Sequence, residues 1–512
     1  MQILDCTLRD GGYYTNWDFD SELVKNYINS FNQLPIDYLE VGYRSVPLKD
    51  YLGEYFYCAV DTLQILKSLS KKKLAIILNE KDIRANDAEK LLKPIEGLVD
   101  LVRIAVDPVN FNRALSLAKS VRALGFEVAL NVMYMSKWSA NKEFLNLLSK
   151  MDKIVDYFYM VDSFGGVYPK EVMDTISLVR SKTSVKLGFH GHNNLEMALA
   201  NTLAAIDAGI DIVDATITGM GRGAGNLKTE LLLTTLNSKG VIDFPYNELS
   251  KVVDDFTFLQ QKHGWGTNLP YMFSGANSLP QKQVMEWVSK RYYSFNSIIR
   301  ALNNQSKGRL DNTRLQSLDF NKEKSCSGVL IIGGGQNAII HSRAIKRFLS
   351  NNPEIIVIHA SSKNALSFLN ISNAQYFCLI GNEGHRLEEI FKEKHIVGKC
   401  ILPPYPRKMG TYIPNAMLDN AYELERIMFA DQYLDSHTAL SIQTALSLKA
   451  KTIYISGYDG YSCNNIAEKE QELFIENQYL FAKAKNSYDL DILSLTPTKY
   501  PELSEVSVYS MI

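Results

Sequence analysis

Residues 185–219, VKLGFHGHNNLEMALANTLAAIDAGIDIVDATITG, contain the pattern that decides the fold. Two short apolar runs, 185–191 and 211–219, enclose a segment of helical length that ends at Gly209. Apolar runs of this length are typical of strands buried on both faces of a parallel sheet. A glycine after a helical pattern is typical of a helix C-terminus. The stretch therefore predicts a strand, a helix and a second, parallel strand.

The same alternation fills the first 235 residues of the chain. Helix-length segments such as 21–34 and 112–125 separate six earlier apolar runs. These runs are 2–8, 37–43, 74–80, 100–106, 127–134 and 156–162. Eight strands alternating with helices over about 235 residues fit a (β/α)8 TIM barrel. A doubly wound open sheet is the competing interpretation from periodicity alone.

The remainder of the chain changes its pattern twice. Segments 246–262 and 283–304 are helical in pattern, and the polar stretch 306–325 is a candidate linker. A second succession of apolar strands and helices begins at residue 327. We therefore predict a barrel domain, a helical extension with a linker, and a Rossmann-like α/β domain, at 1–240, 241–322 and 323–512.

Composition and charge are those of an ordinary globular protein. Hydrophobic residues make up 46% of the 512 residues, and the 55 Lys and Arg nearly balance the 56 Asp and Glu. This balance argues against a nucleic-acid or acidic-membrane partner. The six cysteines form no CxxC pair, which argues against a disulfide framework. Without a signal-peptide pattern or a membrane-length apolar stretch, a cytoplasmic protein is expected.

Two histidines fall where a barrel places its chemistry, at the carboxyl ends of the strands. His190 and His192 are two residues apart, so on a strand both side chains point to the same side. Asp10 follows the first strand. In a closed barrel, the first strand lies two places around the ring from the seventh, which carries the histidines. Two imidazoles and a carboxylate suit a divalent ion such as Mn²⁺ or Mg²⁺. A pair of structural histidines is the alternative for this motif taken alone.

Arg9 stands next to Asp10 and has a planar, permanently charged side chain. Beside a metal that chelates a 2-oxo acid, such a group can stabilise the oxyanion of an enolate. The alternative is a purely structural ion pair.

Four stretches together resemble a known superfamily: LDCTLRDGG (4–12), YLEVGYRS (38–45), YMVDSFGGVYP (159–169) and residues 188–230. They are similar to the metallolyases with an HMG-CoA lyase-like TIM barrel, which include 2-isopropylmalate synthase. Over residues 1–290 the chain resembles the 4-hydroxy-2-oxovalerate aldolases most closely.

The resemblance implies roles for individual residues. Asp10, His190 and His192 would bind the metal, and Asn226 would be a further ligand or would support one. Arg9 would stabilise the enolate. Ser163 would lie by the carboxylate of the oxo acid, and Glu40 would order the metal site.

One position departs from the resembled aldolases. They carry, shortly after TLRDG, a histidine that acts as the general base, whereas this chain has Gly12, Tyr13 and Tyr14 there. A free tyrosine has a pKa of ~10 and is a weak base at neutral pH. Tyr13 is our candidate for the proton-transfer residue, with a pKa that a nearby metal could lower. A metal-bound water is the alternative base, and Tyr13 would then have a packing or substrate-stacking role.

The C-terminal half has its own candidate site. The turn GGGQNA (333–338) follows an apolar run and precedes a helical one, as in a G-x-G-x-x-A phosphate-binding turn. Together with Gly457-Tyr458-Asp459, it faintly resembles the nucleotide-binding fold of sialyltransferase-like and motility-accessory-type proteins. The resemblance implies a nucleotide or nucleotide-sugar ligand near Gly333, Gly335, Asn337 and Asp459. A tight turn without a ligand is the alternative.

These observations predict a metal-dependent aldolase or lyase that makes or breaks a carbon–carbon bond between a 2-oxo acid and an aldehyde. The appended domain suggests a sugar-derived aldehyde and a context in surface-glycan biosynthesis, and we expect a homo-oligomer. Three alternatives remain: an acyl-CoA-dependent condensing enzyme of the 2-isopropylmalate synthase type, a nucleotide-sugar-binding transferase with an accessory barrel, and a non-catalytic protein that lost its base at Tyr13.

Overall fold

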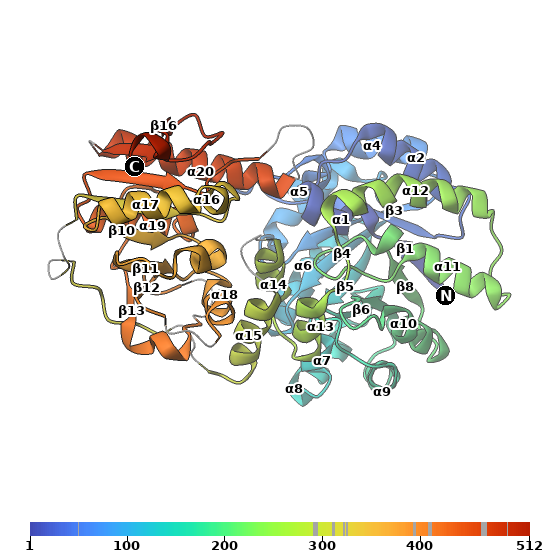
Figure 1. The fold of residues 1–512 in the computed structure, drawn as a ribbon. Coiled ribbons are helices and arrows are strands. Elements are labelled where there is room, and N and C mark those ends of the chain that lie inside the picture. Colours follow the sequence, from blue (N-terminus) through green and yellow to red (C-terminus); the bar gives the residue numbers. More distant parts are fainter. Residues whose placement is uncertain are drawn as a thin grey trace. The chain divides into compact units, whose positions relative to one another are not determined.

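The chain forms two compact units, Met1–Glu286 and Trp287–Ile512. The computed structural model (Figure 1) describes residues 1–512 except 50, 290–294, 310–312, 321–322, 324–325, 393–395, 408–411, 462–467 and 489, and the side chains of 468–469. Part of the predicted linker at 306–325 thus lies outside the described residues. The domain boundaries expected near 240 and 322 stay predictions.

The first unit is a closed barrel of eight parallel strands, in which each strand pairs with the next and the eighth with the first. This confirms the predicted barrel and excludes the open sheet for this half of the chain. The strands are β1 Gln2–Asp5, β2 Tyr38–Tyr43, β3 Lys73–Asn79, β4 Leu101–Val106, β5 Glu127–Val132, β6 Tyr157–Asp162, β7 Lys186–Gly191 and β8 Ile212–Ala215.

Helices surround the strands, and a layer of side chains fills the barrel interior. The helices are α1 Thr7–Thr15, α2 Ser21–Phe31, α3 Glu54–Tyr57, α4 Val60–Leu69, α5 Ala88–Leu92, α6 Phe111–Ala123, α7 Met135–Trp138, α8 Lys142–Leu145, α9 Pro169–Arg180, α10 Ala198–Asp207 and α11 Thr229–Ser238. The interior residues, each at most 3% exposed, are Leu4, Cys6, Tyr38, Ala75, Leu101, Ala129, Tyr157, Tyr159 and Ile212. The barrel is therefore a packed core, and its chemistry lies at the strand ends.

The first strand is shorter than its apolar run predicted, because the buried carboxylate of Asp5 turns the chain. Asp5 Oδ1 accepts hydrogen bonds from the backbone N–H of Thr7, at 2.9 Å, and from the hydroxyl of Tyr27, at 2.7 Å. Its Oδ2 accepts from the hydroxyl of Thr229 at 2.6 Å. Helix α1 starts at once, so Arg9 and Asp10 lie on a helix rather than at a strand end.

The helical extension fixes the loops that follow β7 and β8. Its helices are α12 Tyr246–His263, α13 Leu269–Ala276 and the start of α14 Gln281–Ser289, whereas α15 Phe295–Ser306 belongs to the second unit. The indole N–H of Trp265 donates to the carbonyl oxygen of Thr218 at 3.1 Å. The side-chain amide of Asn194 donates to Tyr271 O at 3.0 Å and to Gln281 Oε1 at 2.8 Å. The predicted helix 283–304 includes most of α14, most of α15 and the residues 290–294, which are not described.

The second unit is a parallel sheet with the strand order β13-β12-β11-β10-β9-β14-β15-β16, which confirms the predicted α/β domain. The order reverses between β9 and β14, as at the ligand-binding crevice of doubly wound folds. The strands are β9 Gly328–Ile332, β10 Ile356–His359, β11 Gln375–Cys378, β12 Lys399–Leu402, β13 Ala421–Glu423, β14 Thr452–Ser456, β15 Asp491–Ser494 and β16 Ser504–Glu505. The helices are α16 Asn337–Ile340, α17 Ser342–Asn351, α18 Glu383–Ile390, α19 His437–Ser447 and α20 Glu468–Ser487.

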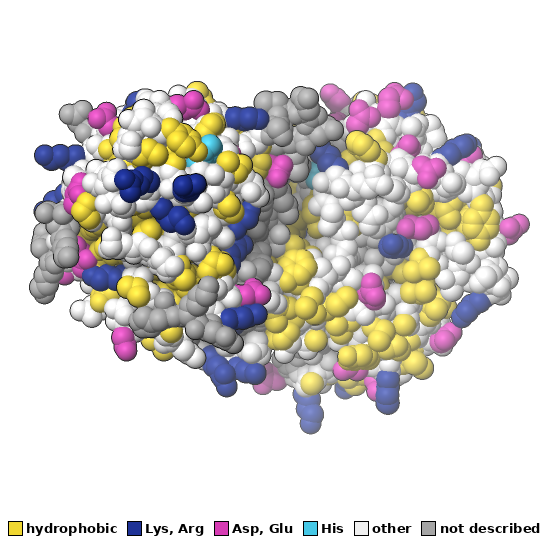
Figure 2. Space-filling view, viewed as in Figure 1, with side chains coloured by type: hydrophobic (Ala, Val, Ile, Leu, Met, Phe, Trp, Pro, Cys, Tyr) yellow, Lys and Arg dark blue, Asp and Glu magenta, His cyan; other side chains and the backbone are white. Residues whose placement is uncertain are grey.

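The surface differs between the units in the pictured view. Figure 2 shows basic and acidic side chains interspersed over the first unit, whereas Lys and Arg gather on the visible face of the second. Helix α17 contributes Arg343, Lys346 and Arg347 to this basic area. Among the described residues, no helix has the length and apolar character needed to cross a bilayer.

Candidate active site and metal centre

Three metal-ligating side chains converge at the carboxyl end of the barrel. Asp10 comes from α1, His190 from β7, and His192 from the loop directly after β7. Their ligand atoms all lie within 4.8 Å of one another, and all three residues are buried. Nε2 of His190 is 3.7 Å from Oδ2 of Asp10. The structure thus brings together the three residues that the sequence placed around one ion.

Both imidazoles are oriented by a hydrogen bond at Nδ1. His190 Nδ1 lies 2.8 Å from Oδ2 of Asp214, and His192 Nδ1 lies 2.7 Å from the carbonyl oxygen of Asp162. A carbonyl oxygen only accepts, so His192 donates from Nδ1 and keeps the lone pair on Nε2. The carboxylate of Asp214 favours the same tautomer in His190. Metal-binding histidines are commonly held in this way.

The protonation states of the cluster favour a bound cation. Burial by itself would raise the pKa of Asp10, but Arg9, His190 and His192 outweigh it and hold that pKa below its ordinary value. Burial, with a contribution from His190, lowers the pKa of His192 to about 3. At neutral pH the cluster therefore presents an ionised carboxylate and a neutral His192 imidazole, the forms that bind metal.

An orphaned buried oxygen lies at the same place. The side-chain amide of Asn226 donates to Oδ2 of Asp10 at 2.5 Å. Oδ1 of Asn226 is buried and accepts no hydrogen bond from the described residues. Leaving a buried acceptor unsatisfied is costly, and oxygen atoms of this kind are ligands for Mg²⁺ and Mn²⁺. The residues present therefore fit a divalent ion, with Asn226 beside the three predicted ligands.

A second set of possible ligands, Cys6, His190 and Asp214, shares one histidine with the first. Burial raises the pKa of the Cys6 thiol well above its usual value. His190 and Asp214 are also already hydrogen-bonded to each other. A protonated thiol is a poor metal ligand, so the Asp10 set fits an ion better.

Two buried arginines fix the carboxylates around the site. Arg9 Nε donates to Oε2 of Glu40 at 2.7 Å, and Arg103 Nη1 donates to the same oxygen at 3.0 Å. Arg103 also donates to Asp214, the carboxylate that orients His190. Glu40 thus connects the two guanidinium groups, and its role in ordering the metal site stays a prediction.

Arg103 and Asp214 belong to none of the predicted motifs, although the sequence carries a signal for each. Both are charged residues inside apolar runs, 100–106 and 211–219, that predict strands buried on both faces. A charge at such a position requires a partner. Their pairing across 111 residues of sequence depends on the closed barrel, which places β4 opposite β8.

Tyr13 lines the cavity, whereas Ser163 is not among its lining residues. The Tyr13 hydroxyl is 3.3 Å from that of Tyr43. Its ring packs edge-on against Trp17, with 5.0 Å between ring centroids. Ser163 is buried directly after β6, and its hydroxyl accepts a hydrogen bond from the backbone N–H of Tyr134 at 2.8 Å. Ser163 therefore positions a segment of the cavity wall.

A cavity of about 390 Å³ opens on the cluster. This volume is in the range of small-molecule sites, roughly 300–1,000 Å³. The walls are strongly polar. Besides the metal-ligating residues they include Arg9, Tyr13, Tyr43, Asn79, Glu80, Lys81, Asp107, Asn110, Asn131, Tyr134 and Arg222.

In the second unit, the structure brings the predicted turn residues together and fills the turn with the chain's own side chains. Oδ2 of Asp459 accepts a hydrogen bond from the backbone N–H of Asn337 at 2.9 Å. The side-chain amide of Asn364 donates to the carbonyl oxygens of Gly333 and Gly335, at 2.8 and 2.9 Å. A carboxylate therefore already stands at the turn where a phosphate was predicted.

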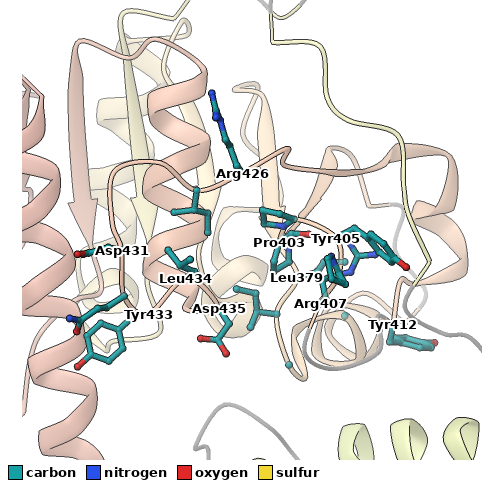
Figure 3. Close-up of a pocket in the computed structure, with 17 residues that line it drawn as sticks. Leu379, Pro403, Tyr405, Arg407, Tyr412, Arg426, Asp431, Tyr433, Leu434 and Asp435 are labelled. Carbon is teal, nitrogen blue, oxygen red and sulfur yellow. Dashed lines mark hydrogen bonds between the residues drawn. The ribbon is translucent and has the colours of Figure 1, made fainter. Parts of the chain in front are cut away.

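One cavity of the second unit lies away from this turn, after the ends of β11 and β12 (Figure 3). Its volume is about 510 Å³. In the view of Figure 3, Tyr405 and Tyr412 stand on one side of Pro403, and Leu434 and Asp435 stand on the other. The carboxyl edge of a parallel sheet is where α/β domains bind ligands.

Comparison with known proteins identifies relatives of part of the chain. Residues 102–254 match the HMGL-like family. A 4-hydroxy-2-oxovalerate aldolase from Carboxydothermus hydrogenoformans is 32% identical over 249 residues, which cover 47% of this chain and 71% of the relative. Oxaloacetate decarboxylase from Mycobacterium tuberculosis is 29% identical over 246 residues, which cover 46% of this chain and 70% of the relative.

One solved structure is considerably more similar in sequence. The N-terminal domain of a candidate aldolase from Bacteroides vulgatus is 58% identical and has a TM-score of 0.57. It aligns over all of that domain and 59% of this chain.

Proposed function

The chain belongs to the HMGL-like family of aldolases and lyases, and from this premise we propose that its barrel is a metal-dependent aldolase acting on a 2-oxo acid and an aldehyde. The observation that carries the proposal is the convergence of Asp10, His190 and His192 on one wall of a cavity that Arg9 also lines. Asp10, His190 and His192 would hold the divalent ion, which supplies Lewis-acid polarisation of the oxo group.

Arg9 supplies a fixed positive charge for the enolate oxygen. Burial would lower the pKa of Arg9, but Asp10 and Glu40 raise it well above its ordinary value, so the guanidinium stays charged. Its Nε is bonded to Glu40 and its Nη1 to Asp10, which orients the group before substrate arrives. A donor oriented in advance stabilises a developing oxyanion without reorganisation.

Proton transfer falls to Tyr13 in this proposal. Its hydroxyl lines the cavity and lies 3.3 Å from the hydroxyl of Tyr43. Burial raises the pKa of Tyr43, so Tyr43 remains protonated and can donate to the oxygen of Tyr13. In the aldol direction, the phenolate of Tyr13 takes a methyl proton from the oxo acid, the enolate carbon bonds to the aldehyde carbon, and the aldehyde oxygen takes that proton back from Tyr13. Cleavage reverses both transfers.

The test is exchange of pyruvate methyl protons into deuterated water, followed by NMR. We expect exchange that depends on added Mn²⁺ or Mg²⁺, that His190→Ala abolishes, and that His341→Ala in the second unit leaves unchanged. Absence of exchange from metal-loaded protein would contradict the proposal. Release of coenzyme A from acetyl-CoA in the presence of 2-oxo acids would instead identify a condensing enzyme.

The tyrosine-lined cavity favours a second function, binding of a nucleotide or nucleotide-sugar by the second unit. Tyrosine rings and a cavity of about 510 Å³ at the carboxyl edge of the sheet suit a ligand with a flat ring. We expect calorimetry on the full chain to detect a nucleoside diphosphate, and Tyr405→Ala to weaken binding more than Asp459→Asn. If Asp459→Asn weakened binding more than Tyr405→Ala did, the ligand would bind at the glycine turn.

A further inference from the structure

Arg222 occupies a distinctive position in the barrel cavity. It lies in the loop GMGRGAGN (219–226) after β8 and lines the cavity together with Tyr13 and the metal-ligating residues. The loop is held on both sides of Arg222. Tyr14 Oη donates to the carbonyl oxygen of Gly223 at 3.2 Å, and the backbone N–H of Asn226 donates to Gly219 O at 3.0 Å. The guanidinium is therefore presented by a fixed loop.

This guanidinium has no charged partner. Among the residues that the structure describes, none forms a hydrogen bond or an ion pair with it. Its Cζ atom lies over the ring of Tyr13, 5.2 Å from the ring centroid. Burial would lower the pKa of Arg222, but Tyr13 and Asp10 hold it above its ordinary value, so the charge is present. A largely enclosed cation that faces a cavity without a counter-ion is a site for an anion.

The charges around the cavity indicate what kind of group would pair with Arg222. The buried carboxylates Asp10, Glu40 and Asp214 are paired with Arg9 and Arg103, and a bound divalent ion would add two positive charges. One of those charges completes the balance with the three carboxylates, and the carboxylate of the oxo acid balances the other. The positive charge of Arg222 is then not balanced by any of these negative charges.

The other charged groups of the cavity do not neutralise Arg222. Glu80 is buried and paired with Arg113. Lys81 and Asp107 both line the cavity and offset each other in charge. An anionic group distinct from the carboxylate of the oxo acid would therefore find an unpaired cation in Arg222.

We propose that Arg222 binds an anionic group on the aldehyde partner, so the substrate is a short hydroxyaldehyde carrying a phosphate or a carboxylate. This inference rests on the proposed aldolase function. Asn110 and Tyr134 add an amide and a hydroxyl to the cavity wall, where they can bond to hydroxyl groups of such a substrate. The anionic group takes no part in bond making. It holds the aldehyde carbon at the enolate carbon while the carbon–carbon bond forms.

Calorimetry with unreactive analogues tests the proposal. Glycerol 3-phosphate, glycerate and glycerol are titrated into the metal-loaded full chain, with and without pyruvate. We expect at least one of the two anions to bind about 10-fold or more tightly than glycerol. Arg222→Gln should weaken that anion by about 10- to 100-fold, Arg222→Lys should restore part of the loss, and the exposed control Arg347→Gln should bind as the unaltered protein does.

The anion that binds more tightly identifies the substrate as a phosphorylated or a carboxylated aldehyde. Equal binding of all three analogues, or unchanged anion affinity in Arg222→Gln, overturns the inference. So does a loss confined to pyruvate affinity, because Arg222 would then serve the oxo acid. Proton exchange from pyruvate is measured separately in the same variants, so failure of the aldolase proposal is distinguishable from failure of this one.

Discussion

Two glycine-rich loops, 219–226 and 333–338, lie at the carboxyl ends of parallel strands, but different groups surround them. After β8, the loop 219–226 leaves the Asn226 amide oxygen buried without a hydrogen-bond partner among the described residues, and its Arg222 lines the cavity. After β9, the turn 333–338 is occupied by the Asp459 carboxylate and the Asn364 amide. Glycine allows another group to come close to the backbone, but residues distant in sequence supply that group. Both places hold buried oxygen atoms without a partner among the described residues, Asn226 Oδ1 at the first and Asp459 Oδ1 and Asn364 Oδ1 at the second. The difference is that the first loop also presents a guanidinium to a cavity.

The largest effect is expected at the metal-ligating cluster. His190→Ala removes one ligand and leaves Asp214 without its imidazole partner, so we expect loss of the bound ion and a fall in pyruvate proton exchange of about 10³-fold or more. Metal content by mass spectrometry and exchange by NMR check this. Retention of a stoichiometric ion would show that these residues do not form the site.

A large loss of stability is expected from Arg103→Met. The change leaves Glu40 and Asp214 in the barrel core without their shared counter-ion, and breaking a buried pair costs about 3–5 kcal/mol. Urea denaturation measures the free energy of unfolding. The control is Arg180→Met, whose pair with Asp211 has side chains 40% and 34% exposed and should contribute less than about 1 kcal/mol. Equal losses in both variants would contradict the buried network.

The folding stability of the second unit should decrease at acidic pH because its core contains a buried histidine. His359 on β10 is fully buried, and burial lowers its pKa to about 4. The unfolded chain binds a proton near pH 6.5 and the folded chain does not, so stability is present above that pH and is lost as pH falls towards 4. We expect a loss on the order of 2 kcal/mol between pH 7 and pH 5.

His359→Leu should flatten this pH dependence, measured as the urea midpoint of the second unit's transition. His341→Leu, which changes a less buried histidine of the same unit, is the control. An unaltered slope in His359→Leu would assign the acid sensitivity to other groups.

The smallest effect is expected at the filled turn. Asp459→Ala removes the acceptor for the backbone N–H of Asn337, a contact that resembles a helix cap and contributes about 1 kcal/mol. Thermal unfolding of the full chain measures it. If Asp459→Ala instead abolished binding of a nucleoside diphosphate, the turn would be a ligand site and the comparison between the two loops would fail.

Most of the barrel and its three candidate metal ligands could be predicted because they depend on local rules. Strand periodicity places His190 and His192 on one side, and barrel closure brings Asp10 towards them. The exact element carrying Asp10 could not be predicted, because the turn after β1 is made by Asp5 with Thr7, Tyr27 and Thr229. The last of these lies 224 residues away.

The sequence by itself determined the eight-strand rhythm, the histidine pair and the acidic residue after the first strand, because peptide geometry and burial pattern act over a few residues. Tertiary structure alone decided which charges are paired. Arg103 finds Asp214 across the barrel, Asp459 closes the second turn, and Arg222 is left facing the cavity. The reason is that an ion pair depends on the distance between side chains in the folded chain, and the register of strands far apart in sequence sets that distance.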